Sequence, residues 1–177
     1  MTEPLAIRPA IVADFAPITA IYAHYVRTHL ATFELEPPAL AEMRARHRAT
    51  TRAGFPYLVA VAGTRVLGYA YAAHYRLRPA YRHSVEDSIY VDPESTGRGV
   101  GSRLLAALVE SCAAQGYRQM IAVIGDSANH ASIRLHARCG FASVGTLPAV
   151  GFKFGRWVDS VLMQRALGAG AETPPAL

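Results

Sequence analysis

The chain has 177 residues, of which 51% are hydrophobic and 18% are charged, so it suits one folded domain with a sizeable core and is unlike a disordered chain. Its net charge of +5 comes mostly from arginines scattered along the sequence, which favours a small anionic ligand and argues against nucleic acid as a partner. Because no charged leader precedes an apolar run and no apolar stretch approaches the ~18 residues of a membrane span, we expect a cytoplasmic protein with no membrane partner.

The first part of the chain predicts one short strand and two helices. The strand covers residues 5–10, and the second helix covers residues 39–53. Between them lies a helix whose apolar residues recur at steps of three and four: Phe15, Ile18, Ile21, Tyr22 and Tyr25.

The link between these two helices, residues 28–38, contains an aromatic side chain beside a carboxylate, Phe33 and Glu34. A Pro-Pro pair ends the link, as expected of a plain connector. Long loops of mixed composition also tend to hold binding residues, so both interpretations stay open.

From residue 56 onward the pattern changes to strands rich in Val, Ile and Tyr, predicted over residues 56–63, 65–75 and 84–91. The remaining chain predicts, in order, a helix, a strand, a helix and two strands, over residues 102–116, 117–125, 127–140, 141–152 and 156–167. We therefore expect a single mixed α/β domain over residues 1–167, followed by a flexible Gly/Pro/Ala-rich tail over residues 168–177.

Two cysteines, Cys112 and Cys139, fall on apolar faces of the two later helices. They have neither CxxC spacing nor a nearby His/Cys cluster, so we interpret them as core residues and expect no metal site.

Three glycines at alternate positions, Gly97, Gly99 and Gly101, lie between a predicted strand and a predicted helix. Glycine lets backbone N–H groups turn toward a ligand, and the helix N-terminus adds partial positive charge, so this segment predicts an anion site. The GxGxG spacing differs from the GxGxxG of dinucleotide sites, and no Lys-Ser/Thr pair follows, as a P-loop requires.

The helix predicted over residues 127–140 has a polar stripe. At about 100° per residue, Asn129, Ser132 and His136 fall within one sector. The other side carries apolar residues, namely Ala131, Leu135 and Cys139. The stripe is either a wall that faces a ligand or a solvated face.

An ordered set of motifs covers nearly the whole chain, from IRPA through VEDSIYV, GRGVGSRLL and QGYRQMIAVIG to GFKFGRWVDSVLMQR. Through these motifs the sequence resembles the GCN5-related N-acetyltransferase (GNAT) superfamily, and most closely its phosphinothricin and methionine sulfoximine acetyltransferases. The resemblance implies the α/β GNAT fold, with a mixed, mostly antiparallel sheet of about six or seven strands, a splayed central pair and about four flanking helices. It also implies an enzyme that moves an acetyl group from acetyl-CoA to the amino group of a small amino-acid-like acceptor, without a metal.

The resemblance assigns the glycine segment to the pyrophosphate of acetyl-CoA. Thr96 stands where the superfamily pattern has Gln or Arg, and we expect the backbone N–H groups to keep the binding without that side chain. It further implies that the strand over residues 84–91 splays from its neighbour at a bulge and pairs with the pantetheine. The residues implied in acetyl-CoA binding are Ile89, Tyr90, Val91, Gly97, Arg98, Gly99, Val100, Gly101, Ser102, Asn129 and Ser132.

Glu86 is the candidate general base, because a carboxylate in a strand of apolar residues has a raised pKa and can take a proton from an ammonium group. Alternation along the strand cannot fix the face that Glu86 uses, but Asp87 must use the opposite one. The resemblance favours Glu86 as the base. His136 stands where many superfamily members have a tyrosine acid, and it is either an acid or a residue that contacts the cofactor without transferring a proton.

For the acceptor, the resemblance implies binding of its acidic end by Arg78 and Tyr81, since a guanidinium suits a carboxylate or phosphinate. Phe33 and Glu34 fit a loop that closes over the amine, and Lys153, in the GFKFG motif, is a candidate for contact with substrate or a second subunit. A homodimer is implied by the family likeness alone.

Two other functions stay open. The enzyme could acetylate another amine, such as a polyamine, an aminoglycoside or a protein N-terminus, although an arginine in the pocket favours an anionic acceptor. The chain could also be an acetyl-CoA-binding sensor without catalysis, against which the presence of Glu86 and His136 argues. The sequence leaves the physiological acceptor undetermined.

Overall fold

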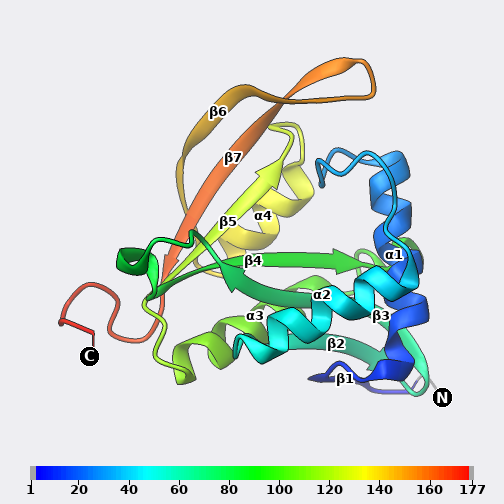
Figure 1. Cartoon of the computed structure of the whole chain (residues 1–177), viewed down its shortest axis with the longest axis horizontal. Coiled ribbons are helices and arrows are strands. Elements are labelled where there is room, and N and C mark those ends of the chain that lie inside the picture. The colour runs from blue at the N-terminus through cyan, green and yellow to red at the C-terminus, as the bar shows by residue number, and fades with distance from the viewer. Residues whose placement is uncertain (1–2, 176–177) are drawn as a thin grey trace.

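The computed structural model describes residues 3–175, which form one seven-stranded sheet in the order β1-β2-β3-β4-β5-β7-β6 with four α-helices (Figure 1). The strands are β1 (Leu5–Pro9), β2 (Tyr57–Ala62), β3 (Arg65–His74), β4 (Ser84–Val91), β5 (Gln119–Gly125), β6 (Ala142–Lys153) and β7 (Arg156–Ala166). The helices are α1 (Phe15–Thr28), α2 (Leu40–Arg52), α3 (Val100–Ala114) and α4 (His130–Arg138). The predicted fold class is confirmed, and the bounds of the elements differ from the predicted ones by only a few residues.

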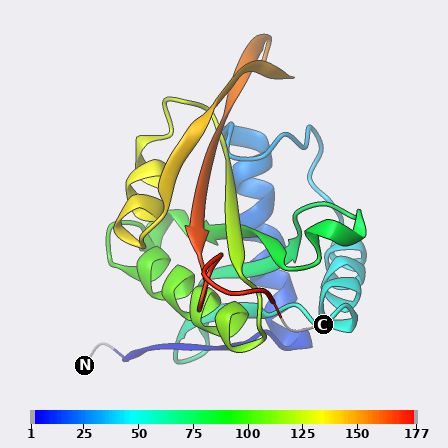
Figure 2. The same ribbon diagram turned by 90° about the vertical axis from the view of Figure 1, so that its left-hand side faces the viewer.

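The sheet is antiparallel except between β4 and β5, which run parallel. Strands β2 to β4 form a meander, β1 pairs with β2 after the two intervening helices α1 and α2, and α3 makes the crossover that the parallel neighbour of β4 requires. Strand β7 lies between β5 and β6, so the β6–β7 hairpin extends the sheet and its far end projects from the body of the molecule (Figures 1 and 2).

The central strands β4 and β5 diverge. They pair only from Ser84↔Gln119 to Asp87↔Ala122. Beyond that point β4 continues along β3, and β5 continues along β7. The predicted splay is therefore confirmed, but the predicted bulge is wrong, because the described part of β4 pairs with β3 without any shift in register. The gap opens because each strand follows its outer neighbour.

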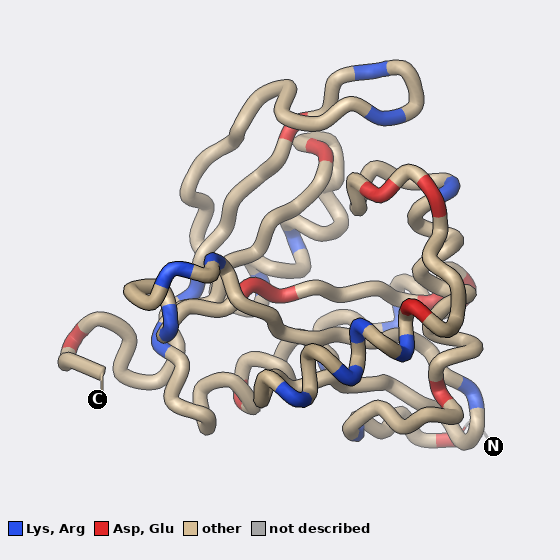
Figure 3. Tube along the Cα trace, in the orientation of Figure 1, with Lys and Arg blue, Asp and Glu red and all other residues tan. Residues whose placement is uncertain are grey.

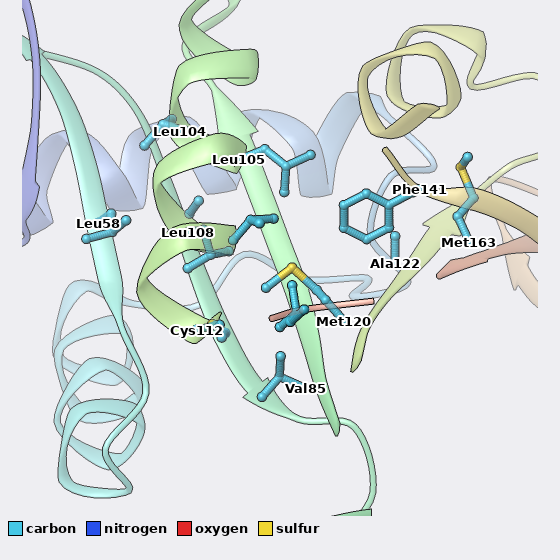
Figure 4. Close-up of a cluster of buried hydrophobic side chains, with 14 of the residues drawn as sticks. Leu58, Val85, Leu104, Leu105, Leu108, Cys112, Met120, Ala122, Phe141 and Met163 are labelled. Atoms are coloured by element: carbon cyan, nitrogen blue, oxygen red, sulfur yellow. The ribbon is translucent and has the colours of Figure 1, made fainter. Parts of the chain in front are cut away.

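Two hydrophobic clusters cover the two faces of the sheet. One contains the apolar stripe of α3, formed by Leu104, Leu105, Leu108 and Cys112, which packs against strand residues such as Val85 (Figure 4). This stripe confirms the amphipathic helix predicted from its spacing. The second cluster joins α1 to the other face, where tyrosines of β2, β3 and β4 stack. Successive side chains of a strand point to opposite faces of the sheet. Because both faces are covered, neighbouring residues of β4 pack into different hydrophobic clusters.

Charged residues are spread over several elements, including α2 and the β6–β7 turn, as the scattered arginines of the sequence predict (Figure 3). Within residues 3–175, no helix is both long and apolar enough to cross a bilayer. The same residues bring no three His, Cys, Asp or Glu side chains together in a way that could hold a metal ion.

The C-terminal segment contacts the start of β5. The guanidinium of Arg118 donates hydrogen bonds to the Gly170 and Pro174 carbonyl oxygens and to Thr173 Oγ1, at 3.2–3.4 Å. The flexibility of residues 168–177 thus stays a prediction, and its last two residues lie outside the described part of the chain.

Candidate functional site

The gap between β4 and β5 holds two connected hollows. The inner cavity, of about 220 Å³, is lined by residues of β4, β5 and α4, including Glu86 and His136. The outer groove, of about 800 Å³, runs past the glycine segment and the N-terminus of α3. The two hollows share six lining residues, Ala31, Ile89, Tyr90, Gly125, Asn129 and Ser132, so a ligand in the groove can reach the inner cavity.

The glycine segment lines the outer groove and has the backbone that an anion site needs. Gly97 and Gly99 have φ values of 74° and 77°, in the left-handed region that side chains disfavour. Gly99 caps α3, so the backbone N–H groups of Gly101 and Ser102 lie in its first turn, where they have no partner within the helix. Five of the six residues predicted here line the groove, whereas Arg98 is exposed outside the described lining.

Strand β4 offers unpaired backbone to the gap. Ile89, Tyr90 and Val91 line the groove. Beyond Asp87 the edge of β4 that faces β5 has no strand partner in the described chain, so its N–H and C=O groups are available to an extended ligand. Tyr25 Oη donates a 2.7 Å hydrogen bond to the Val91 carbonyl oxygen and marks one end of this free edge.

Helix α4 forms the opposite wall. Asn129 caps the helix, since its Oδ1 accepts a 3.2 Å hydrogen bond from the Ser132 N–H, and both residues line both hollows. The predicted division of this helix into a ligand side and an apolar side is wrong in part. Ala131 and Leu135 also line the groove, because α4 presents a wider sector to it than three polar residues suggest.

Glu86 lines the inner cavity, and alternation along β4 places it on the same face as Tyr90, which packs against the second cluster. Its neighbour Asp87 also lines this cavity and contacts His136 of α4, and it shares its face of β4 with Val85, which packs in the cluster that contains α3. Burial raises the pKa of Glu86 above its usual value, the nearby Asp87 carboxylate raises this pKa further, and Arg76 lowers it. A carboxylate of this kind accepts protons more readily than a solvated one.

His136 is 2% exposed and lies in the wall of the inner cavity. Its Nε2 lies 3.0 Å from Asp87 Oδ2, and its Nδ1 lies 2.8 Å from the Ser132 carbonyl oxygen. Sequence analysis missed Asp87 as a partner of His136. The available signal was alternation, which places an acid on the same face of β4 as Val85, where burial requires a partner.

The loop between α1 and α2 closes the inner cavity with Ala31, Thr32 and Phe33. Lys153 Nζ, at the end of β6, donates a 2.8 Å hydrogen bond to the Thr32 carbonyl oxygen and so fastens this loop. Burial lowers the pKa of Lys153 below its usual value, while Glu34 raises it. Phe33 lines the cavity, whereas Glu34 is not among the described lining residues.

Glu34 instead forms an ion pair with Arg46 of α2, at 2.5 Å. The two remaining acceptor candidates, Arg78 and Tyr81, lie in the exposed turn before β4, and Tyr81 packs its ring against Tyr75. Among the described residues, neither Arg78 nor Tyr81 lines either hollow. The structure therefore places Phe33 in the lining of the inner cavity and ties Lys153 to the neighbouring Thr32, while Glu34, Arg78 and Tyr81 are not among the described lining residues.

Comparisons with known proteins agree on one family. Residues 18–141 match the family described as Acetyltransferase (GNAT) family. The chain is 56% identical to the phosphinothricin N-acetyltransferase of Alcaligenes faecalis, over 92% of this chain and 82% of that protein. It is 44% identical to the L-methionine sulfoximine/L-methionine sulfone acetyltransferase of Pseudomonas paraeruginosa, over 96% and 98%. The crystal structure of a phosphinothricin acetyltransferase from Sinorhizobium meliloti, in complex with AcCoA, superposes with a TM-score of 0.94 at 48% identity, covering 99% of this chain and 94% of that one.

Proposed function

This chain belongs to the acetyltransferase (GNAT) family, and from that membership we propose that it transfers the acetyl group of acetyl-CoA to the amino group of a small amino-acid-like acceptor of the phosphinothricin or methionine sulfoximine type. The observation that carries the proposal is that the groove along the glycine segment and the cavity with the Glu86 carboxylate share six lining residues. The use of acetyl-CoA, an intracellular metabolite, supports the predicted cytoplasmic location.

The outer groove is proposed to bind acetyl-CoA. Its pyrophosphate meets the N–H groups of Gly101 and Ser102 at the start of α3, where the helix dipole favours negative charge. The pantetheine then lies along the free edge of β4, and the thioester reaches the residues that both hollows share. Thr96, in this arrangement, directs its hydroxyl to the Pro93 carbonyl oxygen at 3.0 Å and stabilises the turn.

The inner cavity is proposed to be where the amine reacts. Glu86 takes one proton from the acceptor ammonium, and the free amine attacks the thioester carbonyl carbon. A backbone N–H of β4 stabilises the oxyanion. The C–S bond then breaks, the nitrogen loses a second proton, and the CoA thiolate takes up a proton.

A panel of candidate acceptor amines, each assayed for release of the CoA thiol from acetyl-CoA, tests this function. We expect CoA thiol release with methionine sulfone, methionine sulfoximine and phosphinothricin, and little with spermidine or an aminoglycoside, because the relatives act on amino-acid analogues, which are not polycations. Faster release with a polyamine would favour the alternative amine acetyltransferase. Tight acetyl-CoA binding without thiol release on a broad amine panel would favour a sensor. Roles for Arg78, Tyr81, Glu34, Phe33 and Lys153 in acceptor binding stay predictions.

We also propose that the β6–β7 hairpin forms a homodimer interface. Exposed aromatic side chains gather there, with Phe152, Phe154 and Trp157 exposed by 57%, 56% and 67%. Large exposed apolar patches mark interaction sites in soluble proteins. The same hairpin carries Lys153, whose bond to Thr32 connects it to the loop over the inner cavity.

Replacement of Trp157 by glutamate is expected to convert the dimer into a monomer, because a buried charge opposes association. Sedimentation velocity measures the change. Val12→Glu is the matched control, since Val12 is 65% exposed in the short helical turn before α1 and not in the hairpin. Monomeric wild-type protein, or a dimer that survives Trp157→Glu, would contradict the interface.

A further inference from the structure

The buried pair of Asp87 and His136 leaves His136 no N–H to offer to a ligand. The Ser132 carbonyl oxygen can only accept, so the imidazole Nδ1 at 2.8 Å must carry a hydrogen. Nε2 faces Asp87 Oδ2 at 3.0 Å, inside a site where His136 and Asp87 are 2% and 6% exposed. Both ring nitrogens are thus bound to acceptors of the protein, although the ring itself lines the inner cavity.

We propose that Asp87 is a positioning residue, which holds His136 as a doubly protonated imidazolium in the cavity wall and so removes it from proton transfer during turnover. This inference deepens the proposed acetyltransferase function and rests on it only for its kinetic consequence. Glu86, on the other side of β4, is then the residue that exchanges protons with the acceptor. The thiolate takes its proton from the acylated nitrogen and not from His136.

The surroundings of the pair support the charged state. Asp87 Oδ1 has no hydrogen-bond partner among the described residues, so the Asp87 carboxylate depends on the charge of His136 for compensation. Burial alone lowers the pKa of His136, but the hydrogen bond and charge of Asp87 and the Ser132 carbonyl outweigh burial and raise it above the usual value.

The other titratable groups near the pair are Glu86 on β4, Cys112 on α3 and Cys139 on α4. Burial raises the pKa of Cys112 to about 12 and also raises that of Cys139, so both stay neutral thiols at physiological pH. The Phe141 ring meets the imidazole edge-on, 5.1 Å between centroids, and adds no charge. Asp87 is therefore the group that sets the protonation of His136.

The test is the isosteric variant Asp87→Asn, followed by NMR of histidine side chains labelled with ¹³C and ¹⁵N. In the wild type, we expect the His136 signals to report an imidazolium with no titration around pH 6.5, the usual histidine value. In Asp87→Asn, His136 is expected to lose its charge near or below that pH, because burial is no longer offset. In kinetics, the kcat profile of the variant should show no new limb at this pKa, because His136 exchanges no proton during turnover.

Glu94→Gln is the matched control, because it removes one negative charge from an exposed ion pair with Arg65, outside the site. We expect wild-type His136 signals and pH profile in this variant. A wild-type His136 that titrates near pH 6.5, or one whose pKa is the same in Asp87→Asn, would overturn the proposal. The wild-type NMR result stands even if the variant misfolds. Because the NMR needs no acceptor, failure of the acceptor panel and failure of this inference are separate results.

Discussion

Glu86→Gln is expected to lower kcat by about 10²- to 10⁴-fold, the usual contribution of a general base, and to leave acetyl-CoA affinity nearly unchanged. Glutamine keeps the shape of the side chain but cannot accept a proton from an ammonium group. Glu86 lines the inner cavity and not the outer groove, so the acetyl-CoA site should keep its contacts. Steady-state thiol release gives kcat, and calorimetric titration with acetyl-CoA gives the affinity.

The pH dependence follows from the raised pKa of Glu86. Only the ionised carboxylate accepts a proton, so kcat/KM should fall as the pH falls through the pKa of Glu86. Because burial and the Asp87 carboxylate raise this pKa, the acid limb should lie above the usual value for a glutamate. The limb should disappear in Glu86→Gln.

A matched control is Glu110→Gln, which changes an exposed glutamate of α3 in the same way. It should retain wild-type kcat and the same acid limb. Unchanged turnover of Glu86→Gln at neutral pH would remove Glu86 from the role of base, whatever the acceptor.

Gly125→Ala is expected to lower kcat/KM by about 10²-fold, the size of effect that a misplacement of about 1 Å at a reacting centre produces. A Cβ at Gly125 would lie 2.1 Å from the Leu30 carbonyl oxygen, which is backbone and cannot rotate away. Gly125 lines both hollows, and the loop that carries Leu30 also carries Ala31 and Thr32 of the inner cavity. The loop must therefore move, and we expect the KM values for both substrates to rise.

Overpacking of this kind should also lower the free energy of unfolding by about 1–3 kcal/mol, measured by urea denaturation. Gly145→Ala is the control, because a Cβ at Gly145 meets nothing within 4 Å and neither glycine is among those with positive φ in the described chain. Wild-type kinetics in Gly125→Ala would show that the loop does not fix the cavity.

Much of the fold follows from local patterns. The apolar spacing of α1 and α3 and the Val, Ile and Tyr runs of β2 to β5 determine their own secondary structure, because side-chain period selects helix or strand. Gly97 and Gly99 likewise have the left-handed backbone that glycine permits, just before α3. These features depend on residues that are neighbours in the chain, and the sequence alone determines them.

The contents of the inner cavity depend on packing between distant segments. Alternation places Glu86 and Asp87 on opposite faces of β4, but only the packing of α4 decides that Asp87 meets His136, 49 residues away. Likewise, the position of the β6–β7 hairpin lets Lys153 donate a hydrogen bond to the Thr32 carbonyl oxygen. The position of α2 lets Arg46 form an ion pair with Glu34. The splay of β4 from β5 needs no bulge, because each strand keeps its outer partner. The sequence by itself determined the elements and the glycine backbone at the start of α3. The tertiary structure decided which side chains share the cavity, because contacts between distant segments depend on how elements pack and not on local period.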